Sequence, residues 1–311
     1  MIKIFKKIML LMLIAGQVRS VAFGMKPMNA NERAARVMAK SSAGNTELHF
    51  LAIYGQLDGI NKLLKPVPKH EEIVLVMARN RDGLTALHCA AINGQTEGIS
   101  AILAVVPAAQ KTAFVMAKGL YGQTALHSVA SYGQADGISL LLEAAPKENR
   151  FAFVMAIDKD GRTALHCAAV NGNKEVIIKL LNALSVEQRF AFIMGMDRSG
   201  CTALHAAVSY GQVEIVRILL EALPEEQRVA FATTKSLEGW TALQLTERGH
   251  VVGKEDEIVD EIRVLLDAIP AEQRHAFIMA KSPEGWTVLQ YAEKKGHKVV
   301  VSVLDKYIKD C

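Results

Sequence analysis

The sequence has few aromatic residues, and this scarcity bears on how its core can be built. Phe, Trp and Tyr make up 6% of the 311 residues, whereas half of the chain is hydrophobic. Aliphatic side chains must therefore fill the interior, and the frequent Ala, Leu and Met favour helices. A chain with this much apolar sequence is not expected to be disordered over most of its length.

Acidic residues are absent from the first 22 positions, although four basic residues lie there. These are Lys3, Lys6, Lys7 and Arg19. The rest of the chain holds 32 basic and 32 acidic residues, so it carries no net charge apart from histidine. A neutral body argues against nucleic acid, and against an anionic membrane, as the main partner.

The apolar run near the N-terminus is short. It extends over the nine residues Ile8–Gly16, whereas a helix needs about 20 residues to span a bilayer. A basic start, a short apolar run and the small residues Ser20 and Ala22 are typical of a secretory signal peptide. We expect residues 1–22 to be a signal peptide, cut after Ala22 or after Gly24. The mature protein would be exported, either secreted or periplasmic, with no stable membrane anchor.

One short motif recurs through the remainder of the sequence. Gly-x-Thr-Ala-Leu-His begins at Gly83, Gly122, Gly161 and Gly200, at intervals of 39 residues. Variants begin at Gly44, Gly239 and Gly285, and the last interval is seven residues longer, which we assign to an insertion at 251–257. A fixed period of this length indicates stacked repeats. We therefore expect one folded domain over residues 28–311, with repeats starting near 44, 83, 122, 161, 200, 239 and 285.

The motif residues resemble the ankyrin repeat. The fourth full unit contains Gly161-Arg162-Thr163-Ala164-Leu165-His166-Cys167-Ala168-Ala169, followed by Asn171-Gly172 and Leu180-Leu181. The resemblance implies a β-turn, two antiparallel helices and a connection that projects sideways, stacked into an all-α solenoid. The residues agree with this, since Thr163 is a suitable N-cap and Gly172 suits the end of a helix.

The repeat is longer than the usual length of about 33 residues. The additional residues follow the second helix, in blocks such as 224–231, where Pro224 precedes two acids. Pro at the first helical position with acids in the first turn predicts a helix. We expect a short third helix in each repeat, although a strand remains the alternative because the block is short and apolar. A lone third helix at 32–40 and an outer helix at 299–308 should cap the two ends.

Motifs for catalysis are missing. The sequence has no Gly-rich phosphate loop, nucleophile elbow or His-Glu-x-x-His. Successive members of the histidine column lie one repeat apart, too far to share a metal ion, and the family implies that they bond turn backbone. The column consists of His49, His88, His127, His166 and His205. We expect no catalytic residues, metal, cofactor or small-molecule substrate. An enzyme site hidden in the irregular sixth repeat stays open as the alternative.

The four cysteines do not suggest disulfides. Cys89 and Cys167 occupy the same place in two repeats that are separated by another repeat. Helical layers stack about 8–10 Å apart, so two layers exceed the reach of a disulfide. Neither Cys201 nor Cys311 has an evident partner, and we expect the thiols to be free.

The resemblance places partner binding on the turn tips and on the exposed end of each first helix. Aromatic residues, which dominate interface energetics, concentrate there. The predicted partner-binding residues are Tyr54, Leu84, Tyr121, Tyr132, Arg162, Tyr210, Trp240 and Trp286. The alternative is that the aromatic side chains merely pack on neighbouring repeats.

We therefore expect a protein–protein interaction module that binds a partner protein through a concave face. A resemblance to ankyrin proteins of host-associated bacteria implies contact with host proteins. A periplasmic scaffold, or a protector of an enzyme, is the alternative.

Overall fold

The computed structural model describes residues 38–65, 67, 69–248 and 255–310, and its regular elements there are helices. The predicted signal peptide, the start of the domain near 28 and most of the predicted N-terminal cap at 32–40 lie outside these residues. Within them, no helix is long and apolar enough to cross a membrane.

Each repeat begins with a short first helix and continues with an antiparallel second helix. The first helices are α3 (Glu47–Ile53), α6 (Ala86–Ile92), α9 (Ala125–Ser131), α12 (Ala164–Val170), α15 (Ala203–Ser209), α18 (Ala242–Arg248) and α21 (Val288–Lys295). The second helices are α4 (Leu57–Leu64), α7 (Thr96–Val105), α10 (Ala135–Ala144), α13 (Lys174–Asn182), α16 (Val213–Glu221), α19 (Glu255–Asp267) and α22 (Lys298–Lys309).

A third helix follows the second in the first six repeats, so the expected helix is confirmed there over the alternative strand; among the described residues, none follows the second helix of the seventh repeat. These helices are α5 (Lys69–Val76), α8 (Ala108–Val115), α11 (Lys147–Val154), α14 (Val186–Ile193), α17 (Glu225–Ala232) and α20 (Ala271–Met279). Their start differs by one residue from the expectation. Pro224 is the N-cap of α17, and its ψ of 153° is extended, so the helix begins at Glu225.

The limits of each first helix follow from two residues. Thr163 precedes α12 with extended backbone and closes a capping box with His166, which satisfies N–H groups that the first turn leaves open. At the other end Gly172 has a φ of 68°, a left-handed conformation that glycine adopts without a steric penalty. Between these two residues there is room for a helix of seven residues.

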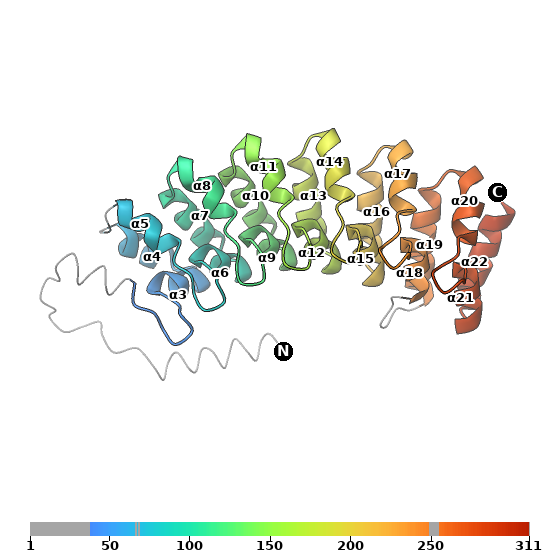
Figure 1. Cartoon of the computed structure of the whole chain (residues 1–311), viewed down its shortest axis with the longest axis horizontal. Helices are drawn as coiled ribbons and strands as arrows, with labels where there is room; N and C mark the ends of the chain where they lie inside the picture. Colours follow the sequence, from blue (N-terminus) through green and yellow to red (C-terminus); the bar gives the residue numbers. More distant parts are fainter. Residues whose placement is uncertain (1–37, 66, 68, 249–254, 311) are drawn as a thin grey trace, which may run out of the picture.

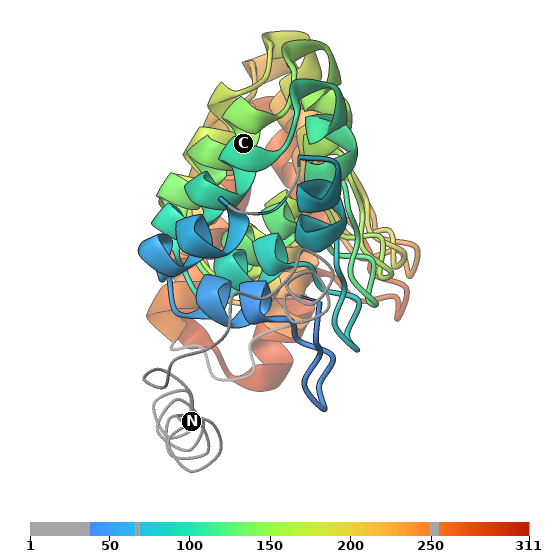
Figure 2. The ribbon, with the colours of Figure 1, turned by 90° about the vertical axis from the view of Figure 1, so that its left-hand side faces the viewer.

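The helices stack into a bowed array with one continuous core. In Figure 1 the first helices lie along the lower, inner side and the third helices along the upper, outer side. The turns between repeats project in a row along one side, as Figure 2 shows. The apolar column Phe114, Phe153, Phe192 and Phe231 is at most 1% exposed, so the third helices close the outer edge of the core.

The sixth repeat departs from the others at its second helix. Helix α19 has 13 residues and begins at Glu255. Glu255–Glu257, at the end of the insertion, thus form the start of an extended second helix, and residues 251–254 lie outside the described part. Helix α22 ends the array as the expected terminal outer helix, with Lys298, Lys306 and Lys309 exposed.

Candidate protein-binding surface

Hydrogen bonds tie each turn to the next along the row. The amide of Lys159 donates to the carbonyl of Tyr121 over 2.9 Å, and that of Arg198 donates to the carbonyl of Asp160, also over 2.9 Å. Within a turn, Asp158 Oδ1 accepts from the amides of Asp160 and Arg162, both at 2.9 Å. The turns are therefore rigid supports for the side chains at their tips.

We use the term inner surface for two sets of residues: the turns that precede the first helices, and the C-terminal ends of those helices. The histidine column forms the layer beneath it. His166 Nδ1 lies 2.9 Å from Thr163 Oγ1, and its Nε2 lies 3.1 Å from the carbonyl of Cys201 in the next turn. The same pair of contacts recurs at His49, His88, His127 and His205. The prediction that these histidines bond turn backbone is confirmed.

Burial governs the charge of this column. It lowers the pKa of His88 from 6.5 to about 4, and it also lowers the pKa of the other four histidines. All five are therefore neutral at pH 7. Burial also raises the pKa of the Cys89 thiol to about 12 and that of Cys167 to about 11. These two thiols are free and, together with Cys201, form no disulfide among the described residues.

Four predicted tyrosines are exposed on the inner surface. Tyr54, Tyr132 and Tyr210 are the C-caps of α3, α9 and α15, and their exposed fractions are 38%, 57% and 61%. Tyr121 lies at a turn tip and is 65% exposed. Asn93 and Asn171 replace the tyrosine in the second and fourth repeats, and their side-chain amides bond back to the carbonyls of Cys89 and Cys167. The alternation therefore leaves an exposed ring in every second repeat.

The remaining predicted residues differ in their accessibility. Arg162 is exposed, whereas Leu84 and Trp286 are half-buried. The expectation that Trp240 is accessible is wrong, because its side chain is 3% exposed. The Tyr291 ring of the seventh repeat lies 6.0 Å from the Trp240 ring, and the Arg248 guanidinium, from the sixth repeat itself, lies 4.1 Å from the Trp240 ring centroid. Trp240 thus packs between repeats, which is the alternative that the sequence analysis gave for the aromatic side chains.

The turns also carry exposed aliphatic side chains that the sequence analysis missed. These are Leu120, Ile157, Met196 and Leu237, which are 46–79% exposed. The available signal was an apolar residue at a turn position that is basic in other repeats. Arg79 and Lys118, for example, stand where Ile157 and Met196 follow at 39-residue intervals, and both basic side chains donate to carbonyls of the next turn.

A pocket of about 370 Å³ opens on the inner surface between the third and fourth repeats. Tyr121 and Tyr132 line it together with Asp158, Lys159 and Asp160 of the next turn. Of the predicted residues, this pocket brings together Tyr121 and Tyr132. Arg162 is instead directed toward Asp197, at 4.0 Å, and Trp286 lines a separate pocket with Lys294, whose ammonium lies 4.3 Å from the Trp286 ring centroid.

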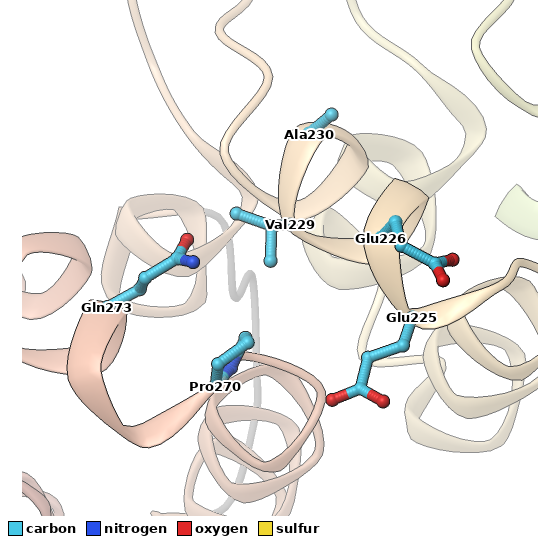
Figure 3. A pocket seen from close by; sticks show the side chains of 6 residues that line it. All are labelled: Glu225, Glu226, Val229, Ala230, Pro270 and Gln273. Atoms are coloured by element: carbon cyan, nitrogen blue, oxygen red, sulfur yellow. The ribbon is translucent and has the colours of Figure 1, made fainter.

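A second hollow, of about 540 Å³, lies on the outer side between α17 and α20. Figure 3 shows Glu225 and Glu226 on one wall and Pro270 and Gln273 on the other. It contains none of the predicted partner-binding residues.

A buried carboxylate joins the last two repeats. Glu247 is fully buried, and His297 Nδ1 lies 3.0 Å from its Oε2. Lys295 donates to the Glu247 carbonyl, and its Nζ lies 4.0 Å from Oε2. Regular repeats hold Ala or Val at this position. The contacts lie between α18 and the end of α21, so this cluster links two repeats.

Comparisons with known proteins identify the family. The family model for ankyrin repeats in three copies matches residues 48–152, 110–191 and 152–229, more than half of the chain. The chain belongs to the ankyrin repeat family. Ankyrin repeats are generally protein-interaction modules and typically non-catalytic, and no enzyme family was detected.

A solved structure shares the fold. The ankyrin repeat domain of Bcl-3, described as a unique member of the IkappaB protein family, matches with a TM-score of 0.62 and 20% identity. The match covers 85% of this chain and 100% of that one. Among curated proteins, none matches this chain.

Proposed function

We propose that this ankyrin protein is exported and binds a partner protein through its inner surface. The observation that carries the proposal is where the exposed large apolar side chains lie. Of the fourteen in the described residues, eight belong to the inner surface. They are Tyr54, Leu120, Tyr121, Tyr132, Ile157, Met196, Tyr210 and Leu237. Exposed apolar side chains concentrated on one face are a mark of an interaction site.

The support beneath these side chains strengthens the proposal. The turns are held by bonds to their neighbours, and the first helices begin in capping boxes. A surface that is rigid before binding loses little conformational entropy when a partner docks. The exposed tyrosines add large contact area at a low entropic cost.

Substitution of Tyr132 tests the binding face. The partner should first be captured by cross-linking to the intact protein and identified by mass spectrometry, from host lysate and from periplasmic extract in parallel. We expect Tyr132→Ala to weaken binding by at least about 2 kcal/mol, the usual size of a hot-spot effect. Thermal stability should stay unchanged because the ring is 57% exposed.

Val186→Ala is the matched control, since Val186 is 60% exposed on the outer helix α14. This control should bind the partner normally. Normal binding by Tyr132→Ala together with weakened binding by Val186→Ala would move the interface to the third helices.

Export is tested separately by sequencing the N-terminus of protein recovered outside the cytoplasm. The Lys-rich start and the apolar run Ile8–Gly16 support cleavage after Ala22 or Gly24. We expect the mature chain to begin at Phe23 or Met25. Recovery of external protein that still begins at Met1 would contradict the proposed cleavage.

A further inference from the structure

The pocket between the third and fourth repeats has two aromatic walls. Tyr121 projects from the turn before α9, and Tyr132 caps the end of that helix. Both rings line the pocket and both are more than half exposed. Two accessible tyrosines on one hollow offer flat faces on which a planar group can stack.

The next turn supplies carboxylates to the same pocket. Asp158 uses Oδ1 to accept two backbone amides, which leaves its second oxygen available to an incoming donor. The Asp160 carboxylate makes no hydrogen bond or ion pair with any residue the structure describes. Gln123, which also lines the pocket, has a buried Oε1 with no hydrogen-bond partner in the same part of the chain. The pocket therefore contains hydrogen-bond acceptors that no donor in the described residues occupies.

Positive charge in the pocket is limited to one flexible group. Lys159 is exposed on its rim. Arg162 lies toward Asp197, and Lys118 donates to the carbonyl of Ile157. His127 is neutral because burial lowers its pKa, and both of its ring nitrogens are engaged. Two carboxylates thus face a single ammonium, and the pocket retains a net negative charge.

We propose that this pocket receives an arginine side chain of the partner protein. The guanidinium would stack on the rings of Tyr121 and Tyr132 and donate to the carboxylates of Asp158 and Asp160. Arginine suits the site better than lysine because its planar cation stacks on aromatic faces and donates in pairs. The inference rests on the proposed function, that the inner surface binds a protein.

The array contains its own control at Tyr210. This ring caps the first helix two repeats further on, with an exposure of 61%. Ser199 stands there in place of Tyr121 and Ser236 in place of Asp158. The remaining carboxylate, Glu238, pairs with Arg248 at 3.4 Å. Within the described residues, Tyr210 is thus an exposed tyrosine that lacks the counterparts of Tyr121 and Asp158 and whose neighbouring carboxylate is already paired.

The test uses the full chain labelled with fluorotyrosine, with each fluorine resonance assigned by single Tyr→Phe variants. The probes are Nα-acetyl-arginine amide, the corresponding lysine amide and the citrulline amide, which has nearly the shape of arginine without its charge. We expect arginine to shift the Tyr121 and Tyr132 resonances in a saturable way and to leave Tyr210 unchanged. Arginine should bind about tenfold more tightly than citrulline and more tightly than lysine.

Asp160→Asn supplies the electrostatic arm of the test. Its side chain is exposed, so the fold should persist, and we expect arginine to bind about threefold to fivefold more weakly. Arginine and citrulline binding alike, lysine binding as tightly as arginine, or Tyr210 shifting as much as Tyr132 would each overturn the proposal. Absence of any shift would overturn it too. None of these results would alter partner capture by the intact inner surface, so the two proposals fail separately.

Discussion

The second to fifth repeats differ from the last two in how neighbouring layers are joined. In the regular repeats a buried histidine spans the interface, and the position of Glu247 is held by Ala91, Ala130, Ala169 or Val208, all fully buried. In the sixth repeat Gln244 replaces the histidine and Glu247 the small apolar residue. One fold therefore tolerates two chemistries at the same interface.

The two replacements are not equivalent. Gln244 reproduces the cap contact of the histidine, since its Oε1 accepts from the Thr241 amide at 3.1 Å. Its Nε2 donates to the Ala280 carbonyl at 3.0 Å, at the end of the third helix, rather than to the residue that follows the next turn glycine. Glu247 instead places a carboxylate in the interior, which is unfavourable unless partners compensate it. Its partners His297 and Lys295 come from the seventh repeat. The regular repeats are interchangeable in this respect, whereas the last two depend on each other.

Lowering the pH should produce the largest difference in stability between the two regions. The five column histidines have folded-state pKa values below 6.5 because of burial. Below pH 6.5 the unfolded chain therefore binds more protons than the folded chain, and stability falls as pH falls. We expect little change above pH 7 and a steep loss between pH 7 and 5. Because five groups act together, this loss should exceed that of any substitution below.

Hydrogen exchange followed by mass spectrometry measures this loss by region. Between pH 7 and 5, protection should decline more in the repeats from 44 to 235 than in the last two, where Gln244 and Gln290 do not titrate. Rates must be corrected for the intrinsic pH dependence of exchange. An equal decline in both regions would contradict a role for the histidines.

Truncation of a core leucine tests the comparison between the centre and the end of the array. Leu165 in α12 and Leu304 in α22 are both fully buried. We expect Leu165→Ala to lower the free energy of unfolding by about 2–5 kcal/mol. Leu304→Ala should cost less, because a terminal repeat has one neighbour rather than two. Chemical denaturation measures both, and equal losses would count against a stack stabilised by its neighbours.

The buried carboxylate calls for a double-mutant cycle. His297→Ala removes a partner of Glu247, and we expect a loss of roughly 1–3 kcal/mol from the less compensated acceptor. Glu247→Ala restores the residue of the regular repeats, so the double variant should recover most of that loss. If the two losses simply add in urea denaturation, Glu247 and His297 are not coupled.

Replacement of His166 should have the smallest effect. His166→Ala deletes the capping box and the bond to Cys201, at an expected loss of about 1–2 kcal/mol. His166→Gln should cost less, because Gln244 in the sixth repeat makes the same cap contact and also donates to a backbone carbonyl. It should also reduce the pH dependence of stability between pH 7 and 5. Thermal denaturation at both pH values distinguishes the two variants.

Much of the fold could be predicted because the residues that begin and end each helix recur at a fixed interval. Thr163, His166 and Gly172 set a helix wherever they recur, and Pro224 with its acids marks the third helix. The prediction was least accurate where contacts depend on the following repeat. Trp240 packs against Tyr291 of the seventh repeat, and the Glu247 cluster joins residues about fifty positions apart. No local pattern signals such contacts.

The candidate site was predicted in part for the same reason. Tyr121 and Tyr132 lie where the family pattern places exposed residues, so their accessibility could be anticipated. The pocket between them could not, because it requires the turn at 158–160 to fold beside the preceding repeat. Leu237 and the other exposed aliphatic residues were missed because an apolar side chain in a repeat suggests core.

The Glu247 cluster also constrains how such a gene can change. Unequal crossing-over between the second to fifth units, which share the capping histidine and the small apolar residue, would add or delete layers whose contacting surfaces still match. A crossover that placed the sixth unit before any unit other than the seventh would bury the carboxylate against a layer without His297 or Lys295. Recombination can thus vary the number of regular layers, while the final pair is inherited as a block.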